Sequence, residues 1–118
     1  MLTARGKLGE AGERFAERFL RAQGFLLLAR NFRTRFGELD LVMLDGDVVV
    51  AIEVKTRQNE RFGSPEASVT MAKLRRVYAA FHAYLTLESL LDKPCRVDVV
   101  AVTRSSDGFV CQHFPNVS

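Results

Sequence analysis

Four charged residues interrupt two apolar runs in the segment GELDLVMLDGDVVVAIEVKTR, residues 37–57. They are Glu38, Asp40, Glu53 and Lys55. Carboxylates at the edge of a covered surface repel one another and are costly to desolvate, and a divalent cation or a partnered lysine removes that cost. Oxygen ligands with no Cys or His close in sequence favour Mg²⁺ or Mn²⁺ over zinc. An ammonium beside them can hold a nucleophilic water or stabilise charge on a phosphate, so the segment suggests phosphate chemistry.

The two apolar runs predict a β-hairpin that brings these charges together. Residues 38–44 and 47–57 alternate as strands, and Asp45-Gly46 between them is typical of a two-residue turn. An even loop of this kind puts all four charges at one end of one face, whereas a three-residue loop would mix charges into the apolar face. We therefore predict that the Asp40 and Glu53 carboxylates lie close enough to share one ion.

The predicted register divides the hairpin into two unlike faces. It places Leu44 opposite Asp47, and residues opposite one another share a face. The face without any polar member is expected to contain Leu39, Leu41, Met43, Val48, Val50, Ile52 and Val54. The charged face also carries Val42 and Val49 near the turn, so we expect a helix to cover it.

The remaining elements complete an αβββαβ order followed by one more strand. Apolar spacing predicts a helix over about residues 7–23 and a second helix that is N-capped by Thr70 and ends before Pro94. Strands are expected at 25–35, 96–103 and 109–114. Residues 58–70 lack a clear period and are interpreted as a loop, with a short turn at Pro65.

Composition limits the class of protein. The 118 residues suit a single domain over 1–118, and the formal charge of +3 with a pI of about 9.2 is compatible with a nucleic-acid partner. The sequence shows no signal peptide and no apolar run of about 20 residues, which predicts a cytoplasmic protein without a membrane span.

Simpler explanations exist for most of the charged residues. A Glu-x-Lys pair on a solvated strand is often only a weak ion pair on one face. Arg96 and Asp98 alternate on one face of the fourth strand and are expected to form such a pair. For His113 in the last strand we expect a structural hydrogen bond rather than catalysis.

An acid in the second strand followed by Glu-x-Lys in the third resembles the restriction-endonuclease-like, or PD-(D/E)xK, nuclease superfamily. More narrowly, the chain resembles the YraN family of small uncharacterised bacterial proteins, which is grouped with those nucleases. The matching motifs are GERFAERFLRAQG at 12–24, ARNFRTRFGELDLV at 29–42, VVVAIEVKTR at 48–57, Lys73, and RVDVVAV at 96–102. Val97 departs from the family, which more often has Phe there, and this affects packing rather than the site.

The resemblance implies both a fold and a set of roles. The fold would be α/β, with an αβββαβ core and a central mixed sheet flanked by two helices. Asp40 and Glu53 would be metal ligands and Lys55 the catalytic lysine. Glu13 matches a helix-one glutamate that some resolvase-like members use as an additional acid, although a solvated helical glutamate is the simpler alternative. Glu38 would be an accessory carboxylate.

Basic residues near this site suggest a nucleic-acid partner. Arg30, Arg33 and Arg35 lie on and beside the first strand, and Arg57 and Lys73 flank the acidic cluster. Of these, Arg33, Arg35, Arg57 and Lys73 are predicted to contact nucleic acid, which we expect to be DNA. The leading hypothesis is a Mg²⁺- or Mn²⁺-dependent nuclease, with structured or branched DNA as a suggested substrate. A non-catalytic nucleic-acid-binding module and a protein-interaction domain with a structural acidic cluster are the alternatives, and monomer and homodimer both stay open.

Overall fold

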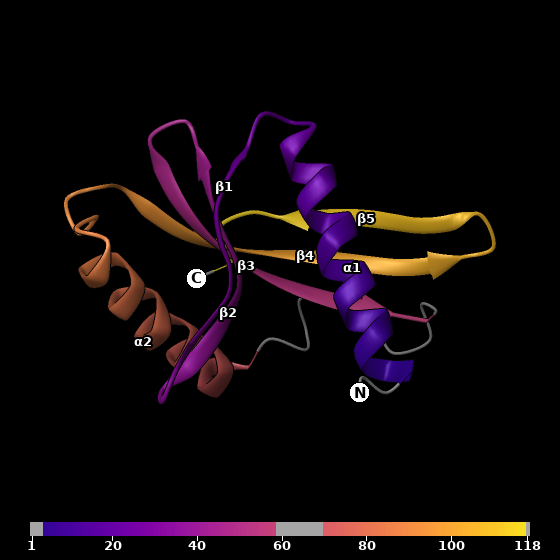
Figure 1. Ribbon diagram of the computed structural model, residues 1–118, viewed down its shortest axis with the longest axis horizontal. Coiled ribbons are helices and arrows are strands. Elements are labelled where there is room, and N and C mark those ends of the chain that lie inside the picture. Colours follow the sequence, from indigo (N-terminus) through magenta and orange to yellow (C-terminus); the bar gives the residue numbers. More distant parts are fainter. Residues whose placement is uncertain (1–3, 59–69, 118) are drawn as a thin grey trace.

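The computed structural model describes residues 4–58 and 70–117, in which two helices flank a five-stranded sheet (Figure 1). The elements are α1 (Ala4–Arg21), β1 (Leu26–Thr34), β2 (Gly37–Asp45), β3 (Val48–Arg57), α2 (Met71–Leu87), β4 (Cys95–Ser105) and β5 (Gly108–Phe114). The sequence-based bounds differ from these by at most a few residues. Residues 59–69, including the turn expected at Pro65, lie outside the described part of the chain.

The sheet is mixed and follows the chain order β1-β2-β3-β4-β5. Neighbouring strands are antiparallel except β3 and β4, which are parallel and are connected through α2. This is an α/β fold with the expected αβββαβ core, to which β5 adds an edge strand. Figure 1 shows α1 crossing the sheet near β3 and β4 while α2 lies beside β1 and β2.

Each helix covers its own apolar layer of the sheet. The α1 layer is built from Ala16, Leu20, Phe25, Leu41, Met43, Val50, Ile52, Val100 and Val102. The α2 layer is built from Leu39, Val42, Val49, Ala51, Leu74, Val77, Ala80, Phe81, Tyr84, Leu85 and Val97. Burial of both sheet faces explains why the central strands are apolar nearly throughout and why the charges in β2 and β3 are exceptional.

The β2–β3 hairpin turns one residue later than predicted. Its turn is Gly46-Asp47, so that Asp45 pairs with Val48 and Leu44 with Val49. Gly46 has a φ of 61° at the first central position of the turn, a conformation that glycine adopts without steric cost. The predicted pairing of Leu44 with Asp47 is therefore wrong, but the register moves by an even number of residues and keeps the expected faces near the turn.

Leu39 lies on the face opposite to the predicted one. It packs in the α2 layer although Leu41, two residues later, packs in the α1 layer. The side chains of the paired strand β1 change faces at the same level. Arg30 points to α1 and Phe32 to α2, because Asn31 between them has a left-handed φ of 52°. Strict alternation thus fails where Asn31 and Asp40 face each other, since an αL residue interrupts the pleat.

The helix ends follow the sequence signals. Gly24, after α1, has a φ of 98°, and the Thr70 side chain accepts a hydrogen bond from the backbone N–H of Lys73 at the start of α2. Within the described residues, neither helix has the length and apolar character needed to cross a membrane.

Candidate active site

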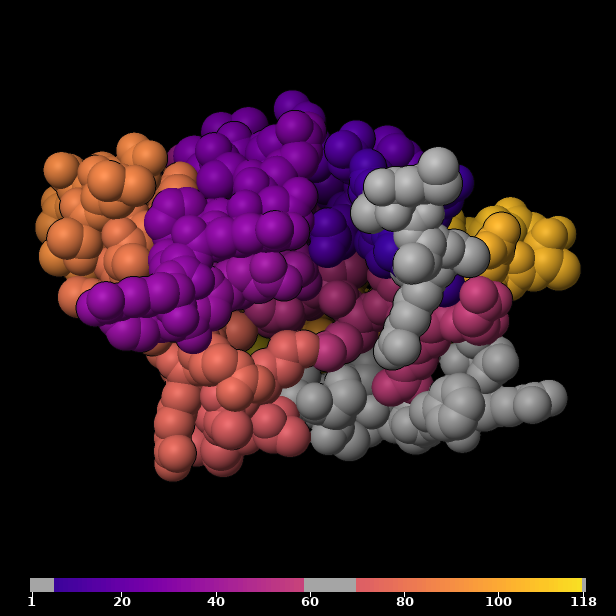
Figure 2. Space-filling model, turned by 60° about the horizontal axis from the view of Figure 1, so that its bottom comes forward, coloured from indigo at the N-terminus to yellow at the C-terminus, as the bar shows by residue number. Residues whose placement is uncertain are grey.

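A cleft opens where β2 separates from β3. Backbone pairing of the two strands ends at Leu41 and Ile52, and beyond that point the Asp40 side chain bridges the strands. Its Oδ2 accepts a 2.8 Å hydrogen bond from the backbone N–H of Val54. In Figure 2 the hairpin formed by β1 and β2 overhangs this hollow, with β3 at its floor and the start of α2 below it.

The cleft has a volume of about 330 Å³ and collects side chains from both helices and the hairpin. Its lining consists of Glu13, Gly37, Glu38, Asp40, Glu53, Val54, Lys73, Arg76 and Val77. Two glycines allow this close assembly. A Cβ on Gly12 would collide with the Thr56 side chain, and a Cβ on Gly37 would lie 2.8 Å from the carbonyl oxygen of Arg76. Gly12 therefore lets α1 approach β3, and Gly37 lets β2 approach α2.

Three carboxyl groups meet in the cleft. Glu53 is only 6% exposed, and its burial, together with the charge and hydrogen bond of Asp40, raises its pKa to about 8. Burial and the same Asp40 also raise the pKa of Glu13 to about 7. Asp40 thus contacts a carboxyl group from β3 and another from α1. Like charges held this close stabilise bound protons or a bound cation.

Two lysines lie beside these acids. Lys55 follows Glu53 by two residues in β3, and Lys73 enters from the first turn of α2. Burial, and then the hydrogen bond and charge of Lys73, lower the pKa of Lys55. Both ammonium groups attract the Glu53 carboxylate. The cleft therefore brings anionic and cationic groups together in one partly desolvated place, as reactions of phosphate esters require.

The donor chemistry fits a hard divalent cation. Asp40 and Glu53 supply carboxylate oxygens in the same cleft, and burial, followed by the charge of Asp40, raises the pKa of Glu53, so that a proton or a cation is favoured there. Within residues 4–58 and 70–117, no three His, Cys, Asp or Glu side chains are arranged to hold a metal ion. Asp40 and Glu53 are the residues that could hold such an ion, which would then keep several of its waters, as Mg²⁺ commonly does.

Of the predicted residues not yet placed, only Glu38 lines the cleft. Glu38 lines it but is exposed, and its Oε2 lies 3.4 Å from Nε of Arg33. Arg35 lies over the ring of Phe36, with its guanidinium carbon 4.8 Å from the ring centroid. Arg57 ends β3, two residues after Lys55. Arg33, Arg35 and Arg57 are not among the residues that line the cleft.

Arg30, one of the basic residues near the site in the sequence, has a structural role instead. Its guanidinium donates two hydrogen bonds, of 2.6 and 2.9 Å, to the buried carboxylate of Glu17 and so ties β1 to α1. Arg76, which is not among the basic residues predicted to contact nucleic acid, does line the cleft. Its spacing of three residues from Lys73 on one helix was the signal that could have identified it.

A second polar cluster is structural, as expected. Asp98 is fully buried and accepts hydrogen bonds from Arg96 and from the backbone N–H of Asn116. Its Oδ2 also lies 2.8 Å from Nε2 of His113, at hydrogen-bond distance. Arg96 also reaches Asp45 at 2.9 Å. The predicted Arg96–Asp98 ion pair and the structural role of His113 are confirmed. This cluster fastens β5 and the following residues to the β2–β3 turn.

Comparison with known proteins identifies the family. The profile of the uncharacterised protein family UPF0102 matches residues 12–102, which include every residue of the cleft. The chain belongs to this family. A UPF0102 protein of Symbiobacterium thermophilum is 47% identical over 102 residues, which is 86% of each chain. Relatives from Hahella chejuensis (43% identical, 86% of this chain and 83% of the relative) and Pelotomaculum thermopropionicum (41%, 98% of each) are similar. The resemblance to the uncharacterised YraN family is thereby confirmed.

Proposed function

We propose that this UPF0102 protein is a Mg²⁺- or Mn²⁺-dependent nuclease that hydrolyses phosphodiester bonds in DNA. The observation that carries the proposal is the contact between Asp40 and the buried Glu53 in the cleft, beside Lys55 and Lys73. A merely solvated Glu-x-Lys pair would not need a buried glutamate whose pKa is raised to about 8.

Each group has a distinct task in the proposed reaction. Asp40 and Glu53 would hold the cation, and the Val54 N–H fixes the Asp40 carboxylate at the strand junction. Mg²⁺ or Mn²⁺, when bound, would polarise the phosphate and lower the pKa of a bound water. Lys55 would orient the attacking water or stabilise the charge that develops as the phosphorus–oxygen bond to the leaving group breaks.

The first turn of α2 would receive the substrate backbone. Lys73 and Arg76 line the cleft from α2, whereas Glu13 lines it from α1. The two cationic side chains would offset the repulsion between the substrate phosphates and the carboxylates. Glu13, with its pKa raised to about 7, is suited to hold or release a proton near neutral pH. Glu38 would act from the exposed margin.

Two alternative functions use the same cleft without chemistry. A nucleic-acid-binding module would need the basic side chains Lys73 and Arg76 but not the Asp40–Glu53 pair. An interaction domain with a structural acidic cluster would need neither a cation nor nucleic acid. The contact between Asp40 and the buried Glu53 favours the nuclease, because burial and then the charge of Asp40 raise the pKa of Glu53, and a bound cation would remove both costs.

The test is a cleavage screen with metal control. The purified protein is incubated with single-stranded, duplex and branched DNA, and with RNA, in Mg²⁺, in Mn²⁺ and in chelator. Cleavage that requires a cation and disappears in Asp40→Asn supports the proposal. Absence of cleavage of every substrate, or cleavage that persists in Asp40→Asn, contradicts it.

A further inference from the structure

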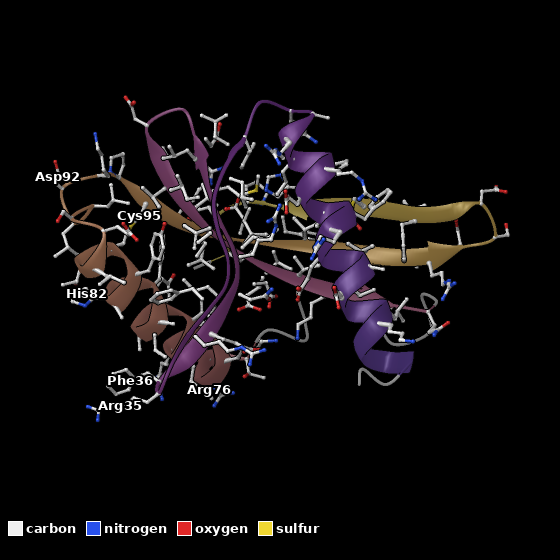
Figure 3. The ribbon with its side chains drawn as sticks, in the orientation of Figure 1. Arg35, Phe36, Arg76, His82, Asp92 and Cys95 are labelled. Atoms are coloured by element: carbon white, nitrogen blue, oxygen red, sulfur yellow. The ribbon has the colours of Figure 1, made fainter. Side chains whose placement is uncertain are left out.

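The tip of the β1–β2 hairpin presents an exposed aromatic ring on Phe36, next in the chain to Gly37, which lines the cleft. Phe36 is 52% exposed. It follows Arg35 and precedes Gly37, whose backbone packs closely against Arg76 of α2. Figure 3 shows Arg35 and Phe36 directed outward from the hairpin tip, with Arg76 of α2 close to the same end. Phe36 directly precedes Gly37, which lines the cleft together with Arg76.

The turn that carries Phe36 is held firmly. The Thr34 hydroxyl accepts hydrogen bonds from the backbone N–H groups of Phe36, at 3.0 Å, and Gly37, at 3.2 Å, and donates one of 3.0 Å to the Gly37 carbonyl. Gly37 in turn abuts the backbone of Arg76, where a Cβ would not fit. An exposed ring on a fixed turn loses little conformational entropy when a partner stacks on it.

The charges around the ring favour a nucleobase over a protein partner. The Arg35 guanidinium lies 4.8 Å from the centroid of Phe36, and Arg76 lines the adjacent cleft. A stable protein interface needs an extended apolar patch, whereas here the ring is neighboured in the chain by an arginine and a glycine. One aromatic ring beside cations is what single-stranded nucleic acid requires, because bases stack while phosphates pair with cations.

We propose that Phe36 is a stacking platform for an unpaired nucleobase that flanks the phosphate bound in the cleft. The inference rests on the proposed function, since it takes the strand in the cleft to be the nuclease substrate. Because Phe36 is next to Gly37 in the chain, a strand that leaves the cleft over the hairpin tip would pass this ring. Bases in an intact duplex are stacked on each other and offer no free ring face, so the platform selects substrates with single-stranded character near the cleaved bond.

The chain offers a direct spectroscopic test because it contains no tryptophan. Phe36→Trp introduces a single fluorophore at the platform, and Leu87→Trp introduces one at a 69% exposed position at the far end of α2. Both are combined with Lys55→Ala, so that binding is measured without cleavage. The probes are an oligothymidylate of about 12 nucleotides, within the range of known single-strand site sizes, and a blunt duplex.

Stacking predicts that the oligothymidylate quenches the fluorescence of the Phe36→Trp variant strongly, that the duplex quenches it weakly, and that neither quenches the Leu87→Trp variant. In the same background, Phe36→Ala should weaken oligothymidylate binding roughly 5- to 150-fold, while Phe36→Tyr should restore it. The inference is overturned if the oligothymidylate does not bind at low salt, if it binds without quenching, or if Phe36→Ala binds as tightly as its parent.

These outcomes are separable from the fate of the nuclease proposal. Cleavage by the parent without quenching of Phe36→Trp leaves the nuclease proposal standing and removes the platform. Quenching without any cleavage by the parent in Mg²⁺ or Mn²⁺ keeps the platform and favours the nucleic-acid-binding module.

Discussion

Oδ2 of Asp40 accepts a 2.8 Å hydrogen bond from the backbone N–H of Val54, across the point where β2 and β3 stop pairing. One side-chain oxygen thus replaces a strand-to-strand contact and leaves the rest of the carboxyl group near Glu13 and Glu53. The relationship makes Asp40 both a structural bridge and the centre of the acidic cluster. Substitutions at this residue can separate the two roles.

Asp40→Asn should abolish metal binding while keeping the fold. The amide oxygen can still accept the Val54 hydrogen bond, but the loss of charge removes one of two carboxylate ligands and relieves repulsion on Glu53. Calorimetric titration with Mn²⁺ should therefore show no binding, and the metal-free melting temperature at pH 8 should equal or exceed that of the parent. Asp40→Ala also leaves the Val54 N–H without its partner and should cost about 1–3 kcal/mol of stability.

The control for this experiment is Asp92→Asn, at an exposed position in the connection between α2 and β4. It changes the net charge by the same amount and should titrate like the parent. Unaltered Mn²⁺ binding by Asp40→Asn would remove Asp40 from the ligand set.

Lys55→Ala should abolish cleavage and leave metal and substrate binding nearly intact. The lysine is placed to act on the water or on the charge of the transition state, whereas the carboxylates are also needed in the ground state. We expect a fall in kcat of at least about 100-fold, measured by single-turnover cleavage, together with an unchanged Mn²⁺ isotherm. Cleavage by Lys55→Ala at the parental rate would show that the lysine has no catalytic role.

Much of the fold follows from local sequence patterns. The element order and the Thr70 cap were predictable, because hydrophobic periodicity and capping chemistry act over a few residues. Asp40 and Glu53 converge as expected, although the turn lies one residue later than predicted and strict alternation fails next to Asp40. The face of Leu39 was not predictable. It depends on a left-handed Asn31 in the neighbouring strand, and nothing in the β2 sequence records that conformation.

The candidate site was predictable to a similar degree. Glu-x-Lys identified the residues of β3, but only the packing of α1 through Gly12 brings Glu13 to Asp40. The spacing from Lys73 indicates Arg76, which lines the cleft, but no sequence signal shows that Arg30 is bound to Glu17. The different roles of the two arginines arise from tertiary contacts.

Lys73→Ala and Arg57→Ala should weaken binding of nucleic acid and reduce its dependence on salt. Each cation that contacts a duplex phosphate releases counterions, so its removal should decrease the slope of log K against log[salt] by about 0.9. The measurement is a fluorescence-anisotropy titration of duplex DNA at several salt concentrations. Lys93→Ala, at an exposed position beyond α2, is the matched control. Equal slopes for Lys73→Ala and the control would exclude Lys73 as a phosphate contact.

Without metal, the protein should lose stability as the pH rises from about 4.5 to 8. Burial and the charge of Asp40 raise the pKa of Glu53 from 4.5 to about 8, so in this window the folded state binds more protons than the unfolded state. The free energy of unfolding then falls with increasing pH. One pKa unit corresponds to about 1.4 kcal/mol, so the loss is on the order of a few kcal/mol. Chemical denaturation in chelator, at intervals between pH 4.5 and 8.5, measures it.

Glu53→Gln isolates this contribution, because glutamine keeps the shape of the side chain but does not ionise. Its stability should change less with pH than that of the parent, whereas the exposed control Glu88→Gln should retain the parental slope. Mn²⁺ at about 100 times its dissociation constant should restore about 2.7 kcal/mol to the parent near pH 8, because it binds only the folded, ionised cluster. The same addition should do little for Glu53→Gln. A parental slope in Glu53→Gln would show that Glu53 does not cause the pH dependence. Equal stabilisation of both proteins by Mn²⁺ would show that Glu53 does not bind the ion.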